Sequence, residues 1–198
     1  MIVSMQHRLV ILSMPKCATH SLIDALGMRA DMVIRHPQGA KHCNYRKFHR
    51  HLRPFLEKFS DQPLETVCLF REPVDWLHSW WRYRQRDALR GHRNSTVGLS
   101  FDTFVNRYFD KVSPGDTLGR QSRFVADAEG GIGVDHLYRY DHLADMVAWI
   151  GGRTGWEIEL GRLNVSPQHG SRDLASSTRQ RVSAELARDF EIYESMAR

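Results

Sequence analysis

The stretch LVILSMPKCATHSL, residues 9–22, joins an apolar run to a short loop and to the start of a helix. The segment Arg8–Ser13 is apolar and β-branched and is bounded by a proline, so we expect it to be a buried strand. A helix should open at Thr19 or His20 and end at Gly27. A strand, a loop and a helix in this order form the unit from which parallel sheets are built.

The rest of the chain repeats this unit. Thr66–Phe70 is a second continuous apolar run, His136–Tyr140 resembles a third core strand, and Met32–Ile34 is a weaker one. Segments with helical spacing separate them, so we predict an α/β fold in which helices flank a central, mostly parallel sheet in three layers. The helices should cover residues 44–59, 101–109 and 143–152, a segment starting at Pro73, and a C-terminal segment capped by Ser176 or Ser177.

Length and composition limit the range of functions. The 198 residues, 41% of them hydrophobic, suit one domain spanning 1–198 with a core of its own. No apolar run reaches the ~18 residues of a transmembrane helix. We read the apolar N-terminus as a core strand instead of a signal peptide. Three scattered cysteines predict neither a disulfide framework nor a CxxC site, which fits a cytoplasmic protein. The net charge of +5 favours an anionic partner.

The loop Met14–Ser21 has the composition of an anion site. It follows a strand, where ligands of open parallel sheets bind, and the first turn of the next helix presents unbonded N–H groups. Lys16 adds a positive charge, and Thr19 and Ser21 add hydroxyl donors. A Walker loop carries its lysine and hydroxyl last, whereas here the lysine comes first. The alternative is an ordinary turn with a solvated lysine.

A second segment, CLFREPVDWLHSWW, repeats this logic one strand further on. Arg71 follows the strand Thr66–Phe70, and Ser79 lies eight residues later in the next helix. An arginine and a hydroxyl can clamp a phosphate, since a guanidinium forms bidentate charge-assisted hydrogen bonds. Two anion sites at neighbouring strand ends indicate a nucleotide with phosphates at both ends.

These two segments together resemble the sulfotransferases that use 3′-phosphoadenosine 5′-phosphosulfate (PAPS). PKCATHSL, residues 15–22, is similar to the family's P-K-x-G-T-x-x-L loop, and residues 71–81 are similar to its R-[DE]-P-x-x-R-x-x-S-x-Y segment. Three later pieces resemble the carbohydrate-type branch: QSRF at 121–124, LNVS at 163–166 and DFEIY at 189–193. The chain departs from the pattern at Ala18, where the family has glycine, and at Trp76 and Trp81, where it usually has arginine and tyrosine.

The resemblance implies a P-loop-like fold and a sulfuryl transfer that needs no metal. Lys16 would stabilise charge on the leaving nucleotide, and Arg71 with Ser79 would hold the 3′-phosphate. The acceptor would be a hydroxyl or an amine, with a carbohydrate or a lipid-linked sugar as the expected class. The donor-binding residues implied are Pro15, Lys16, Cys17, Ala18, Thr19, His20, Ser21, Arg71, Ser79 and Arg123.

A general base is needed for an acceptor hydroxyl, and His42 in GAKHCNY is our first choice. Lys41 beside it could contact the phosphosulfate or an acidic acceptor. Glu72, His20 and His36 are alternatives, although Glu72 is better explained as part of a helix start. His42 could also be an ordinary loop histidine.

Other features leave further alternatives open. The run YRKFHRHLR, residues 45–53, could bind a polyanion or form the solvated face of a helix. Zinc binding through His36, His42 and Cys43 fits no common spacing, and no nucleic-acid-binding motif is present. The competing functions are a kinase-like phosphotransferase and a nucleotide- or polyanion-binding module of the same fold without turnover.

Overall fold

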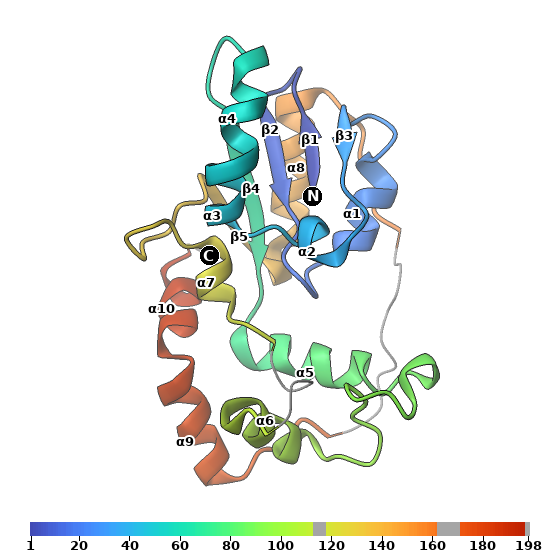
Figure 1. Cartoon of the computed structure of the whole chain (residues 1–198), viewed down its shortest axis with the longest axis vertical. Helices are drawn as coiled ribbons and strands as arrows, with labels where there is room; N and C mark the ends of the chain where they lie inside the picture. The colour runs from blue at the N-terminus through green and yellow to red at the C-terminus, as the bar shows by residue number, and fades with distance from the viewer. Residues whose placement is uncertain (113–117, 162–170, 197–198) are drawn as a thin grey trace. The chain divides into compact units, whose positions relative to one another are not determined.

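Five strands form a mixed sheet with the order β3-β1-β2-β4-β5. The computed structural model describes residues 1–112, 118–161 and 171–196 (Figure 1). These residues divide into a sheet unit (1–71, 121–161 and 196) and a helical unit (72–112, 118–120 and 171–195). The strands are β1 (Ile2–Ser4), β2 (Leu9–Leu12), β3 (Met32–Val33), β4 (Glu65–Phe70) and β5 (His136–Arg139).

The core strands predicted at residues 8–13, 66–70 and 136–140 are confirmed as β2, β4 and β5, and they pair in parallel. Leu12 lies opposite Cys68, and Phe70 lies opposite Arg139, so their carboxyl ends share one edge. The α/β class with a sheet flanked by helices is therefore confirmed.

The N-terminal segment differs from the prediction of one strand, because it folds into two. Strand β1 pairs antiparallel with β2 and with β3, so two of the four strand pairs are antiparallel. The chain reverses where the Arg8 N–H donates to the Met5 carbonyl at 3.1 Å, with Arg8 in the left-handed region (φ 52°). Strand β1 has only three residues, which is too short a stretch for its apolar pattern to predict a separate strand.

Helices flank this sheet. Helix α8 packs against β5 and passes behind the sheet in Figure 1. It continues to Thr154, beyond the predicted end at Gly151-Gly152, and ends at left-handed Gly155 (φ 71°). The predicted basic helix 44–59 forms as a series of short pieces, with a π-helical turn at its centre. These elements are α1 (Thr19–Leu26), α2 (Gln38–Lys41), α3 (Tyr45–Lys47), η1 (Phe48–Leu52), α4 (Arg53–Leu56), η2 (Glu57–Phe59), α7 (Gln121–Val125), η5 (Tyr140–His142) and α8 (Leu143–Thr154).

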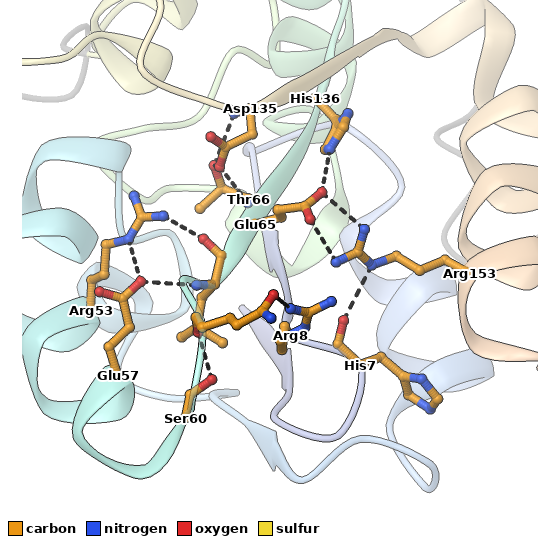
Figure 2. A network of polar contacts seen from close by, with 12 residues as sticks. His7, Arg8, Arg53, Glu57, Ser60, Glu65, Thr66, Asp135, His136 and Arg153 are labelled. Atoms are coloured by element: carbon orange, nitrogen blue, oxygen red, sulfur yellow. Dashed lines mark hydrogen bonds and ion pairs between the residues drawn. The ribbon is translucent and has the colours of Figure 1, made fainter.

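Polar contacts join the amino ends of β4 and β5 (Figure 2). Glu65 accepts two hydrogen bonds of 2.9 Å from Arg153 and lies 2.7 Å from His136 Nε2. The Asp135 carboxylate accepts hydrogen bonds of 2.7 Å from both the backbone N–H and the hydroxyl of Thr66. These bonds fix the register between β4 and β5 at their first residues.

The helical unit starts with a capped helix. Glu72 accepts from the N–H groups of Val74 and Asp75, and Pro73 occupies the first turn, as predicted. The prediction for the C-terminal helix is wrong in two respects. It is two helices that break at Leu186, and its N-cap position is Ala175, one residue before Ser176. The elements are α5 (Pro73–Tyr83), η3 (Asp87–Leu89), α6 (Phe101–Asp110), α9 (Ser176–Glu185) and α10 (Ala187–Ser195).

Candidate functional site

The loop between β2 and α1 is closed around the carbonyl of Met14. That oxygen accepts from the Cys17 N–H at 3.3 Å and from the buried Thr19 hydroxyl at 3.1 Å. Lys16 (φ 67°) and Ala18 (φ 49°) are left-handed, whereas Cys17 between them is not. Alternating handedness turns successive N–H groups toward a common concavity that suits an anion. Ala18 thus adopts the conformation that favours glycine and accepts its steric cost.

Arg71 reaches this loop from the carboxyl end of β4. Its Nη1 donates to the Lys16 carbonyl at 2.9 Å, and its guanidinium lies 4.4 Å from the centre of the Tyr140 ring. The side chain is buried. The two sequence segments predicted to bind anions therefore meet inside the sheet unit, across 55 residues of sequence.

Two further residues that sequence reasoning did not assign hold Arg71 in place. Buried Gln121, at the start of α7, accepts from the Arg71 N–H at 3.0 Å and donates to its carbonyl at 2.8 Å. Tyr140 directly follows β5, so its place at the end of a parallel strand was a usable signal. Nothing in the local sequence indicates that Gln121 would pair with a strand end 50 residues earlier.

His42 and Lys41 lie next to the same loop. Nδ1 of His42 lies 2.7 Å from the Ser13 carbonyl, so it carries the proton and Nε2 keeps a lone pair. Burial lowers the pKa of the His42 imidazole, which favours its neutral form. The buried amine of Lys41 lies 3.1 Å from Nε2 of His20. Burial, and then the Arg35 charge, lower the pKa of the Lys41 amine.

The other predicted residues divide by exposure. Cys17 and Ser21 are buried, Pro15 is half-buried, and His20 is exposed. Arg123 is exposed on α7, two residues after Gln121. Ser79 is buried within α5 of the helical unit. The predicted LNVS segment, residues 163–166, lies outside the described residues.

The cations of this edge, Lys16, Lys41 and Arg71, stand beside a loop with convergent N–H groups and beside an oriented neutral imidazole. Such a set can bind an anionic group and can accept a proton next to it. Glu72, one of the alternative bases, caps α5, where its two oxygens accept backbone N–H groups.

Comparisons with protein-family models, curated proteins and solved structures found no match to this chain. Among the described residues, no group of three or more His, Cys, Asp or Glu side chains is arranged to hold a metal ion. Within the same residues, no helix has both the length and the apolar character needed to cross a membrane.

Proposed function

We propose that this chain is a sulfotransferase with a P-loop-like fold, which transfers a sulfuryl group from PAPS to a hydroxyl or amine. The observation that carries the proposal is the 2.9 Å contact between the Arg71 guanidinium and the Lys16 carbonyl. It joins the two segments that resemble the family's donor-binding motifs. Because the segments are far apart in sequence, their meeting is independent of the resemblance that drew attention to them.

The loop supplies the donor side of the proposal. The N–H group of left-handed Ala18 and those of the first turn of α1 would bind the 5′-phosphate, while the Cys17 N–H stays bonded to the Met14 carbonyl. The Thr19 hydroxyl already donates to the Met14 carbonyl, so its proposed part is to hold the loop in shape. Arg71 would place its positive charge beside the 3′-phosphate. The hydrogen bond from its guanidinium to the Lys16 carbonyl would connect the two phosphate sites.

The transfer step follows from these positions. PAPS supplies an activated sulfuryl group. In the proposed step, the bond from sulfur to the bridging oxygen breaks while the acceptor oxygen or nitrogen forms a new bond to sulfur. Lys16 would stabilise the negative charge that builds on the bridging oxygen of the leaving nucleotide. His42 Nε2 would accept the acceptor's proton, since Nδ1 is committed to Ser13.

A carbohydrate or lipid-linked sugar is the acceptor that we propose, in a cytoplasmic setting that suits three buried cysteines. The alternative within the same site is a module that binds the nucleotide without turnover.

Radiolabelled PAPS tests the proposal with a panel of sugars, glycolipids, alcohols and amines. We expect labelled product with a sugar acceptor, and loss of that product in Lys16→Ala but not in the exposed control Lys58→Ala. Nucleotide binding without product on any acceptor would favour the binding module. Transfer of phosphate from ATP with Mg²⁺ would favour the kinase-like function. Either result would overturn the proposal.

A further inference from the structure

A hollow of about 430 Å³ lies in the sheet unit between the basic segment and the turn after α7. Its volume is within the range of small-molecule sites. It is lined by elements other than the loop that carries Lys16. The side chains that matter for its chemistry are Tyr45, Arg46, His49, Arg50, Asp127 and Glu129.

A π-helical turn shapes one wall. Residues Phe48–Leu52 form η1, and single π-helical turns are frequent at functional sites. The wall carries two pairs at a spacing of four, Tyr45 with His49 and Arg46 with Arg50, and such pairs share one helix face. The Tyr45 and His49 rings lie 5.5 Å apart. This face therefore lines the hollow with two aromatic residues and two arginines, and Tyr45 is the buried member of the set.

Tyr45 is closely packed within the helical wall. The Tyr45 ring packs so closely on Gly133 that a Cβ at Gly133 would come within 2.2 Å of it. Arg53 lies 3.4 Å from the Tyr45 hydroxyl, and burial raises the pKa of that hydroxyl, which therefore stays protonated. The Tyr45 side chain is mostly buried, and only a small part of it lines the hollow.

The opposite wall is acidic. The Asp127 carboxylate accepts from the Gly131 N–H at 2.8 Å, which fixes its position, and Glu129 is exposed beside it. Arg46 bridges the walls, since its Nε donates to the Asp127 backbone carbonyl. The hollow thus has cations on the helical wall and carboxylates on the turn. An anion would meet two carboxylates, and a cation would meet two guanidinium groups.

From this arrangement we propose that the hollow binds a neutral sugar. Each sugar hydroxyl is both a donor and an acceptor, so neighbouring hydroxyls can accept from a guanidinium and donate to a carboxylate. The apolar face of a sugar ring can pack on the ring of exposed His49. This site is separate from the proposed donor site and does not depend on it.

Nuclear magnetic resonance titration of the full chain with maltose, cellobiose and trehalose tests the inference without any nucleotide present. At least one of these disaccharides should shift the amide signals of residues 45–50 and 127–129 in a saturable way. Glycine, glucosamine and sodium sulfate serve as zwitterionic, cationic and anionic probes and should not compete.

Arg50→Gln and Glu129→Gln, both at exposed positions, should each weaken that binding about tenfold, the typical cost of losing a hydrogen bond to a charged group. The exposed controls Lys58→Gln and Asp61→Asn should leave it unchanged. The inference is overturned if none of the neutral disaccharides shifts these signals, or if one of the charged probes binds there more tightly. Because the titration contains no nucleotide, its failure would leave the sulfotransferase proposal intact, and the reverse also holds.

Discussion

Two groups of charged side chains at opposite ends of the central sheet have different partners. At the amino end, Glu65 bonds to Arg153 and His136, so opposite charges neutralise each other within the chain (Figure 2). At the carboxyl end, Arg71 contacts a carbonyl oxygen and an aromatic ring, and Lys41 contacts an imidazole. The partners in these three contacts are neutral groups.

The difference separates stability from binding. An ion pair at the sheet's edge adds little to affinity for a ligand, but it does help to hold β4 against β5. A contact with a neutral group weakens a cation's attraction for an anion less than an ion pair does. We therefore expect substitutions at the carboxyl end to affect ligand binding and turnover, and substitutions at the amino end to affect unfolding.

The largest effect should come from Lys16→Ala. Losing one positioned donor to a developing negative charge typically lowers turnover about 100- to 1,000-fold. Nucleotide affinity should fall less, because the N–H groups of the loop remain. Steady-state kinetics and calorimetry on the same preparation measure the two effects. Turnover equal to the wild type would remove Lys16 from the mechanism.

His42→Gln should follow, with a loss of about 100-fold in turnover at neutral pH. Burial lowers the pKa of His42, so the wild-type rate should fall only once the pH drops below the ordinary histidine value of about 6.5. The substitution should abolish this acid limb. A pH profile of kcat/KM for both proteins measures it, and an acid limb that persists in the variant would assign the base elsewhere.

Glu65→Gln should weaken only the contacts at the amino end of the sheet, where Glu65 bonds to Arg153 and His136. Hydrogen bonds from Arg153, and then from His136, lower the pKa of the Glu65 carboxyl, so its contribution to stability is present above about pH 4.5 and is lost as the pH falls through the lower folded pKa. At pH 7 we expect a loss of about 1 kcal/mol in unfolding free energy, because the side chain is 38% exposed. Urea unfolding of both proteins at pH 7 and pH 3 measures how much unfolding free energy the substitution removes at each pH. An equal loss at both values would contradict the charge-based explanation.

The smallest effect should come from Ala18→Gly. Glycine adopts the left-handed conformation of residue 18 without the steric cost that alanine bears, which should stabilise the fold by up to about 1 kcal/mol. The matched control is Ala25→Gly within α1, where glycine should destabilise by about 1 kcal/mol. Thermal unfolding compares the two. A destabilised Ala18→Gly protein would mean that the loop does not need a left-handed residue in solution.

Sequence alone predicts the strands whose apolar runs are continuous, because burial on both faces leaves an unmistakable pattern in β2 and β4. It fails where the signal is short or long-range. Strand β1 has three residues, and the break at Leu186 interrupts a segment whose apolar spacing carries on across it. The antiparallel pairing of β1 with β2 depends on the turn at residues 5–8, and that segment contains no Gly, Pro, Asn or Asp that would predict a turn.

The candidate site shows the same limit. The place of Lys16 and Arg71 at the same edge of the sheet was predictable, because each follows a clearly apolar strand and the carboxyl ends of parallel strands meet at one edge. Gln121 was not predictable as their support, since its two hydrogen bonds to the Arg71 backbone join segments 50 residues apart. The left-handed geometry of Ala18 was indicated only by the glycine that the resembled family has at this position, because alanine itself does not favour that conformation.

Calorimetric titration with 3′-phosphoadenosine 5′-phosphate, compared with ADP and with ATP plus Mg²⁺, tests the central claim most directly. We predict that the 3′-phosphorylated nucleotide binds most tightly and that Arg71→Lys removes this preference. Exposed Arg90→Lys should retain it, and thermal unfolding should show that both variants fold. Tighter binding of ATP with Mg²⁺, or no nucleotide binding by the wild-type chain, would contradict the account.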